Sequence, residues 1–196
     1  GSLALLTSPG RTDGSGSLIV RNNVFDGVRG FDGLRFGNLD LWTDRFSFVN
    51  NTVQVSPDAR FGSTTSIVET FPAPTSPDLV VIAGNIFVGQ AGFQSGDQFV
   101  FDSTDRDGSG AALDIDYNLF FDFDGTFQRG SSTTGTNNVT GLDPLLTGLL
   151  LELGAGSPAI DASATPAQYA DIPGVDFDGT ARPQGAGFDI GAHERE

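Results

Sequence analysis

One short pattern recurs along the chain and restricts its fold more than any other feature. Each copy has alternating apolar residues, then Asn, then one further residue, and then Phe or Val. The copies are Leu18–Phe25, Phe46–Val53, Val80–Phe87, Leu113–Phe120 and, in shorter form, Thr136–Thr140. Alternation with a period of two predicts β-strands, and the recurrence predicts one supersecondary unit used several times.

The recurring Asn residues are spaced by 28, 34, 33 and 20 residues, at Asn23, Asn51, Asn85, Asn118 and Asn138. Shorter strand-like pieces lie between the copies, at Leu34–Phe36, Ser66–Val68 and Gln98–Phe101. Asp-Gly turn signals separate the pieces, and no segment keeps a convincing helical period over a dozen residues. The chain is therefore predicted to be all-β.

These features favour a parallel β-helix, a solenoid of about four to six coils. In such a stack like residues lie above like, so Phe25, Val53, Phe87 and Phe120 would form one column. The recurring Asn residues would form a ladder in which each amide bonds the Asn of the next coil. A β-sandwich is the competing fold, and a plain loop role is the competing interpretation of the Asn residues. The sandwich gives no reason for the motif to return at one strand phase.

Composition excludes several classes of function. The 196 residues suffice for one domain with a sizeable core. There are 25 acidic and 10 basic residues, a formal net charge of −15, and no Cys. This charge argues against a nucleic-acid partner, and the lack of Cys excludes disulfides and thiolate zinc sites. No apolar run approaches the roughly 18 residues of a membrane span, so none is predicted.

The C-terminal quarter contains four ordered motifs, Gly141–Leu146, Leu151–Asp161, Asp176–Pro183 and Gly187–Glu194. Over residues 142–194 they resemble the C-terminal segment of bacterial surface proteins of the choice-of-anchor Q group. His193 stands where that group more often has an aromatic residue. Residues 15–140 resemble right-handed β-helix repeats more loosely. The resemblance implies a right-handed parallel β-helix that is secreted or held at the bacterial cell surface.

A single domain is expected, with coils over residues 1–141 and the last coil and a C-terminal cap over residues 142–196. The cap would cover the open strand edge of the last coil. Its apolar lid would consist of Leu145, Leu146, Leu149, Leu150, Leu151, Leu153 and Ile160. Asp161, Arg182 and Asp189 would form a half-buried charge network that pins the cap. Because the N-terminal side has no comparable pattern, the coils are expected to continue from an upstream N-terminal part of the same protein, or the first coil is expected to be covered by a partner.

One acidic stretch has the spacing of a calcium loop. Its ligands at positions one, three, five and twelve would be Ser103, Asp105, Asp107 and Asp114. Position one is Ser, and position twelve is Asp in place of the usual bidentate Glu. A solvated Asp-Gly loop that holds no ion is therefore the alternative.

Two further sets have weaker catalytic potential. Asp114 and Asp116 lie two residues apart on one strand face, where a pair of carboxylates could hydrolyse a glycosidic bond. A solvated acidic face is the alternative. Arg35 and Arg45 are the cationic pair available to a polysaccharide lyase, which needs a base and charge neutralisation. A surface ion pair with a nearby Asp is the alternative for Arg35. The lone His, His193, is expected to pack or to lie on the surface rather than serve in a Ser-His-Asp triad.

Trp42 is the candidate ligand-binding residue, because it has a loop-like position and could stack on a sugar ring; core packing is the alternative. Together these features predict a non-catalytic exported module for adhesion or glycan contact. The alternatives are the C-terminal part of a polysaccharide-degrading enzyme, lyase or glycosidase, and a structural rod or fibre segment. The expected partners are a polysaccharide or cell-surface glycan and the upstream domain, and the expected cofactor is Ca²⁺.

Calorimetric titration with Ca²⁺ tests the acidic stretch. We expect the chain to give binding heats that the double variant Asp105→Asn, Asp107→Asn loses, because two of the carboxylate ligands disappear while side-chain size is kept. Equal heats from both proteins would dismiss the stretch as a calcium site.

Overall fold

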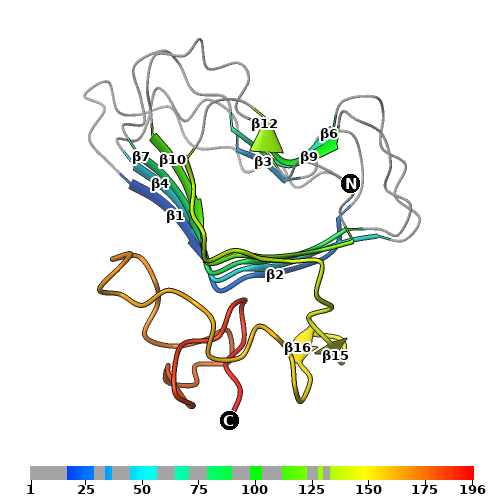
Figure 1. Cartoon of the computed structure of the whole chain (residues 1–196), viewed down its shortest axis with the longest axis vertical. Helices are drawn as coiled ribbons and strands as arrows, with labels where there is room; N and C mark the ends of the chain where they lie inside the picture. Colours follow the sequence, from blue (N-terminus) through cyan, green and yellow to red (C-terminus); the bar gives the residue numbers. More distant parts are fainter. Residues whose placement is uncertain are drawn as a thin grey trace.

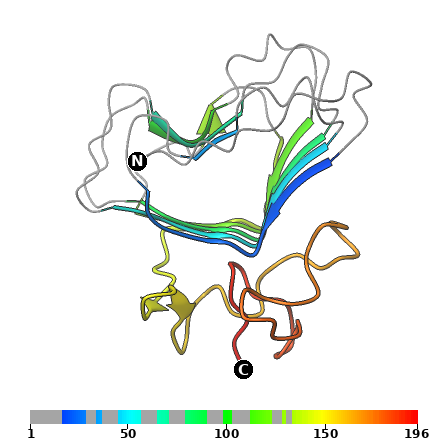
Figure 2. The same cartoon turned by 180° about the vertical axis from the view of Figure 1, so that it is seen from behind.

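The chain folds into sheets of parallel strands. Figures 1 and 2 show the computed structural model from two opposite sides. The structure describes residues 17–28, 34–36, 45–56, 65–70, 79–89, 98–102, 112–122, 128–129 and 133–196. All regular elements within these ranges are strands, which confirms the predicted all-β class. None of the residues described forms a helix long and apolar enough to cross a bilayer.

The strands of the described residues form three parallel sheets and one hairpin. The first sheet contains β1 (Ser17–Arg21), β4 (Arg45–Val49), β7 (Leu79–Ala83), β10 (Ala112–Asp116) and β13 (Thr133–Thr134). The second contains β2 (Val24–Val28), β5 (Thr52–Val55), β8 (Ile86–Val88), β11 (Leu119–Phe121) and β14 (Val139–Thr140). The third contains β3 (Leu34–Phe36), β6 (Thr65–Thr70), β9 (Gln98–Asp102) and β12 (Gln128–Arg129). The antiparallel hairpin is β15 (Leu146–Thr147) with β16 (Glu152–Leu153).

The strand order shows how the chain passes from sheet to sheet. Within each parallel sheet, every strand pairs with the strand three earlier or three later in the chain. The chain therefore visits the three sheets in turn. One circuit through the three sheets is here called a pass, and each pass lies on the one before, so that the passes form a stack (Figure 1). This parallel pairing argues against the antiparallel sandwich considered as the competing fold.

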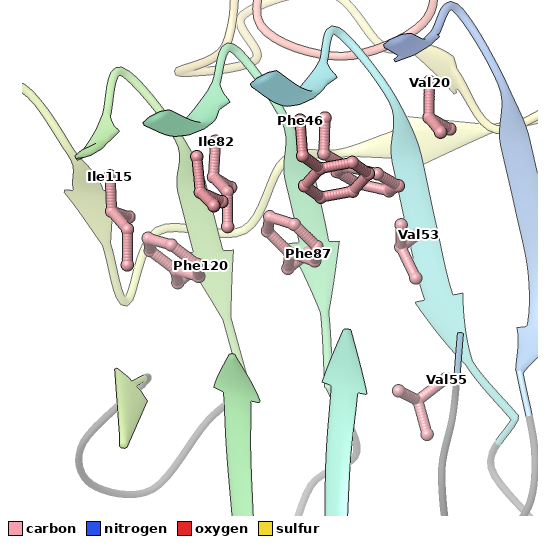
Figure 3. Packing of buried hydrophobic residues seen from close by; sticks show 10 residues of the cluster. Val20, Phe46, Val53, Val55, Ile82, Phe87, Ile115 and Phe120 are labelled. Atoms are coloured by element: carbon pink, nitrogen blue, oxygen red, sulfur yellow. The ribbon is translucent and has the colours of Figure 1, made fainter. Parts of the chain in front are cut away.

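Apolar side chains fill the space between the sheets (Figure 3). The registers place the predicted column, Phe25, Val53, Phe87 and Phe120, on neighbouring strands of the second sheet. Phe48 of the first sheet lies between Phe25 and Phe87, with ring centroids 6.1 Å apart on each side. The alternation of apolar residues in the sequence explains why these side chains all face the interior, because residues two apart on a strand point to the same face.

The five recurring Asn residues lie at the corner between the first and second sheets. The backbone N and side-chain Nδ2 of Asn51 both donate to Oδ1 of Asn85, at 2.9 and 3.1 Å. The same pair of bonds joins Asn23 to Asn51, Asn85 to Asn118, and Asn118 to Asn138. Three of the five, Asn51, Asn85 and Asn118, are fully buried. The row thus satisfies polar groups that would be costly to bury unpaired.

The residue before each of the first four row members turns the corner with a positive φ. These residues are Asn22 (φ 53°), Asn50 (φ 48°), Gly84 (φ 69°) and Tyr117 (φ 57°). Asn and Gly adopt this left-handed conformation most readily, which explains the doubled Asn at Asn22-Asn23 and at Asn50-Asn51. Tyr117 is the costly member of the set and requires support from its surroundings.

Residues 142–196, here called the flank segment, lie beside the stack and not over its end (Figures 1 and 2). They cover outward-facing apolar side chains at the corner. One cluster joins Val49, Val81 and Ala83 of the stack to Ala164 and Ile172. Another joins Ile86 and Leu119 to Leu153, Ala159 and Ile190. The prediction that this segment covers the edge of the last coil is therefore wrong.

The physical reason lies in the strands themselves. Val80 and Ile82 of β7 point inward, yet their neighbours Val81 and Ala83 are buried as well. A strand that is apolar on both faces must be covered on both. The flank segment supplies the outer cover, so its apolar surface is directed to the corner.

Only some residues of the predicted leucine lid are buried in the structure. Leu151 and Leu153 are buried, and Leu146 and Ile160 pack partly buried beside the second cluster. Leu145, Leu149 and Leu150 are exposed, Leu149 by 94% at the turn of the hairpin. Those three positions of the predicted lid are wrong.

Replacing Asn85 by Ala tests the amide row. The variant leaves the backbone N of Asn51 without its acceptor in a buried site. We expect a loss of about 3 kcal/mol in the free energy of unfolding, measured by urea denaturation. Asn138→Ala is the matched control, because Asn138 is only half-buried and water can replace its bonds. Equal losses for the two variants would contradict a special role for the buried rungs.

Candidate functional site

The flank segment is fastened to the corner by hydrogen bonds from the positive-φ residues. Nδ2 of Asn50 donates to the carbonyls of Asp189 (3.1 Å) and Gly191 (3.3 Å). In return the backbone N of Gly191 donates to the carbonyl of Gly84 at 2.7 Å. Asn50 is fully buried, and its role was not foreseen from the sequence. The doubled Asn50-Asn51 is the signal that could have revealed it, since one Asn faces each side of the corner.

Close approach at this joint requires a glycine. Gly191 has a φ of 102°, and an added Cβ would lie 2.7 Å from Cδ1 of Ile86. The next residue, Ala192, donates its backbone N to Oγ1 of Thr52 at 3.0 Å. The joint at Gly191 is therefore a tight main-chain contact.

Arg182 is the centre of the flank segment. Its guanidinium donates to the carbonyls of Asp189 (2.9 Å) and Gly191 (2.8 Å) and to Oε2 of Glu194 (3.0 Å). The side chains of Arg182 and Glu194 are both fully buried. The acidic partner of Arg182 is thus Glu194, whereas Asp161 and Asp189 were expected.

The two Asp side chains bind backbone groups. Asp189 accepts from the backbone N of Asp161 and of Arg195, both at 2.7 Å. Asp161 accepts from the backbone N of Gly187 at 2.6 Å. The predicted direct charge network of Asp161, Arg182 and Asp189 is corrected accordingly, because carboxylates in a loop-rich segment serve the unpaired N–H groups nearest to them.

Burial is the largest influence on the pKa values of the charged groups around Arg182. It lowers the pKa of Arg182, although the charges of Glu194, Asp176 and Asp189 oppose the change. Burial also raises the pKa of Asp189 and of Glu194, against the effect of the backbone N–H groups that bind them. The buried ion pair therefore costs desolvation, and each charge depends on its partner.

Asp114 and Asp116 share the outward face of β10, while Ile115 between them is fully buried in the core. Asp116 accepts two hydrogen bonds from Asn137, one from its backbone N (2.9 Å) and one from Nδ2 (2.8 Å). An added Cβ on Gly135 would lie 2.0 Å from Cγ of Asp116. The carboxylate of Asp116 is thus enclosed by the following pass of the chain.

Asp114 is bound by the flank segment. Its Oδ2 accepts from the hydroxyl of Tyr169 at 3.1 Å. Burial, followed by the charge of Asp114, raises the pKa of this hydroxyl, so it stays a donor. Tyr169 also makes an edge contact with Tyr117, whose hydroxyl bonds Nε2 of Gln168. These contacts supply the support that the positive φ of Tyr117 requires. Asp114 is thus bound by Tyr169 and Asp116 by Asn137, so both candidate catalytic carboxylates have structural partners.

Several predicted site residues lie outside the described residues: Trp42, Ser103, Asp105 and Asp107. Of the proposed calcium ligands, only Asp114 falls within them, and Tyr169 binds it. Arg35 lies in β3 and Arg45 begins β4. These two arginines therefore belong to different sheets, the third and the first.

A group of potential metal ligands lies in the flank segment. Single ligand atoms of Asp176, Asp178 and His193 all lie within 4.8 Å of one another. Both oxygens of Asp176 already accept backbone N–H groups, from Asp178 and Thr180 on one side and from Glu194 on the other. This bonding makes Asp176 the organiser of its own turn, as Asp commonly is in loops.

His193 is buried, in line with the expected packing role. Its Nε2 lies 2.8 Å from the carbonyl of Leu150, and its Nδ1 lies 3.1 Å from Oδ2 of Asp178. The ring also packs against Phe177, with centroids 5.3 Å apart. His193 therefore joins the β15–β16 hairpin to the turn at Asp176 and has no Ser partner within the described part of the flank segment.

Comparisons with protein-family models, with curated proteins and with solved structures found no match to this chain.

Replacing Arg182 by Gln tests the centre of the flank segment. The variant leaves Glu194 as an unpaired buried carboxylate, so we expect a loss of about 3 kcal/mol in the free energy of unfolding and a lower melting temperature. Arg21→Gln is the control, because that side chain is exposed and its contact with the carbonyl of Asp171 is 3.5 Å long. A thermally silent Arg182→Gln would show that the ion pair does not hold the segment.

Proposed function

We propose that the chain is a right-handed parallel β-helix module whose C-terminal segment braces one corner of the stack. The proposal rests on the order of strands, three apart in each of the parallel sheets, and on the unbroken row of Asn at the corner. Right-handedness follows the strong preference of parallel strand connections for that hand. It also agrees with the resemblance of residues 142–194 to β-helix surface proteins.

We further propose that the module is exported and non-catalytic, and that it binds a polysaccharide or cell-surface glycan. The hydrogen bonding of the two candidate catalytic carboxylates, Asp114 and Asp116, supports the non-catalytic role. Asp116 is 9% exposed and holds two bonds from Asn137, and Asp114 is bound by Tyr169. Glycoside hydrolysis needs one free acid and one free base or nucleophile that face the same bond. Carboxylates committed to structural donors are poorly suited to either task.

The sequence segments between the strands are where we place the glycan contact. A rigid stack that carries connecting segments is a common arrangement for binding, because the frame holds the segments in fixed relative positions. Trp42 lies in one such segment, and Ser103, Asp105 and Asp107 lie in another. In this proposal Trp42 stacks on a sugar ring, and the acidic segment takes Ca²⁺, which would also offset the charge of an acidic glycan.

The net charge supports a glycan partner in preference to nucleic acid. A formal charge of −15 repels phosphate chains and keeps an exposed module soluble. A rod that binds nothing would share the same stack, so binding is the property that distinguishes the two roles.

A glycan array with the chain, run with and without Ca²⁺, tests this function. We expect binding to at least one polysaccharide and a loss of about tenfold in affinity, or about 1.4 kcal/mol, for Trp42→Ala. Phe177→Ala is the control, because Phe177 is an exposed aromatic on the flank segment. Assays for new reducing ends and for unsaturated products accompany the array. Release of either product would replace the proposed role with an enzymatic one, and an array without any binding would favour a passive rod.

A further inference from the structure

A cleft with a volume of about 480 Å³ opens in the flank segment, next to β16 of the hairpin. Asp176, Asp178 and His193 all line this cleft, and single ligand atoms of the three lie within 4.8 Å of one another. They come from two stretches of chain that are bonded to each other, since the backbone N of Glu194 donates to Oδ2 of Asp176 at 2.9 Å. The backbone therefore holds the three side chains together at the wall of an open space.

The position of the ring hydrogen on His193 points to a cation in this cleft. The side chain is only 5% exposed, and its Nε2 lies 2.8 Å from the carbonyl of Leu150. A carbonyl can only accept, so Nε2 carries a hydrogen. In the neutral ring Nδ1 then presents a lone pair to Oδ2 of Asp178, 3.1 Å away. Two acceptors cannot bind each other, so this contact needs a positive charge, either a second ring proton or a metal ion.

The same hydrogen bond is the one that metal-binding histidines use. A histidine that binds a metal through one ring nitrogen almost always donates from the other to a carboxylate or a backbone carbonyl, and this bond fixes the tautomer and the ring orientation. The carbonyl of Leu150 has that place at His193. The ring is also held by Phe177, with centroids 5.3 Å apart. Nδ1 is therefore presented to the cleft in a fixed direction.

Asp176 is buried and oriented in a similar way. Its Oδ1 accepts from the backbone N of Asp178 and of Thr180, and its Oδ2 accepts from the backbone N of Glu194. An ionised carboxylate offers about four lone-pair positions, so these bonds leave one of them, on Oδ2, within the described structure. That oxygen is the one bonded to the residue that follows His193. Asp176 can thus keep its structural bonds and still provide one ligand atom.

The charge of the cleft favours a cation. Glu152 lines it together with Asp176 and Asp178. Arg195 lines it as well, and Nη1 of this residue donates to the carbonyl of Leu153 at 2.7 Å. Carboxylates gathered in a concave site raise the local concentration of cations.

We propose that Asp176, Asp178 and His193 bind a Zn²⁺ ion, and that water in the cleft completes its coordination. One imidazole nitrogen with carboxylate oxygens suits Zn²⁺, whereas Ca²⁺ takes about six to eight oxygen ligands. Two ligand atoms of a tetrahedral Zn²⁺ with bonds of about 2.1 Å lie about 3.4 Å apart. The 3.1 Å between Nδ1 of His193 and Oδ2 of Asp178 is close to that separation. The side chain of Asp178 is 51% exposed, so it can move by the small amount that completes the set.

Calorimetric titration of the intact chain with ZnCl₂ tests the proposal. It is run on the double variant Asp105→Asn, Asp107→Asn, so that the acidic stretch proposed for Ca²⁺ does not contribute. We expect saturable binding, and a loss of at least about a hundredfold in affinity for the added change Asp178→Asn, because removing even an outer partner of a metal ligand costs about 10- to 100-fold. Glu152→Gln is the matched control, since it removes one charge from the same cleft without removing a ligand. Equal losses for the two changes, or no binding heat at all, would overturn the proposal.

Nuclear magnetic resonance of the single histidine separates a metal ion from a second ring proton. The chain contains one His, so ring nitrogen signals belong to His193 without ambiguity. We expect Zn²⁺ to shift the Nδ1 signal while Nε2 keeps its hydrogen, and we expect Ca²⁺ at the same concentration to leave both signals unchanged. His193→Gln is expected to abolish Zn²⁺ binding, because the Gln amide can still donate to the carbonyl of Leu150 but offers no ring nitrogen.

An Nδ1 signal that stays in its protonated position when Zn²⁺ is added would show an ion pair with Asp178 and would overturn the metal site. The exposed Asp178→Asn keeps the test decisive if the buried His193→Gln fails to fold. None of these measurements depends on glycan binding or on the acidic stretch, so the metal site can fail while the proposed function stands, and the reverse also holds.

Discussion

A buried amide at the corner of the stack is the constraint on which the rest of the structure depends. Each inner Asn has its oxygen and its nitrogen satisfied only when the passes on either side are aligned to within a hydrogen-bond length. An unpaired amide in this position would cost several kcal/mol, so the row fixes the register of two sheets at once. The connecting segments can then differ in length without shifting the strands, as the uneven spacings of 28, 34, 33 and 20 residues require.

The same corner also determines where the rest of the chain goes. Left-handed residues precede the first four row members, and one of them, Asn50, presents its amide to the flank segment. Apolar residues on the outer faces of β4 and β7 add the free energy of burial to these bonds. The outer side of this corner is consequently used for stability. This leaves the connecting segments as the proposed place for a ligand, and it explains why Asp114 and Asp116 have structural partners.

Prediction from sequence succeeded where the pattern is local or strictly repeated. The period of two revealed the strands, and the recurrence of Asn and Phe at one phase revealed which residues face one another across passes, such as Phe87 and Phe120. It failed where one part of the chain meets another without repetition. Asp189 and Glu194 both follow Arg182 within twelve positions, and composition alone does not tell which carboxylate accepts from the guanidinium. The continuous apolar sequence of β7, Leu79–Ala83, is nevertheless a signal of burial on both faces.

The sequence by itself determined the strands, the inward column and the row of amides, because these follow from side-chain alternation and from identical residues placed at equivalent positions. Only the tertiary structure decided that residues 142–196 cover the flank and not the end, and that Arg182 pairs with Glu194. Both outcomes depend on which buried polar groups and apolar faces lie within reach after the stack has formed. Distances of that kind arise from the packing of segments far apart in the chain, and no local pattern encodes them.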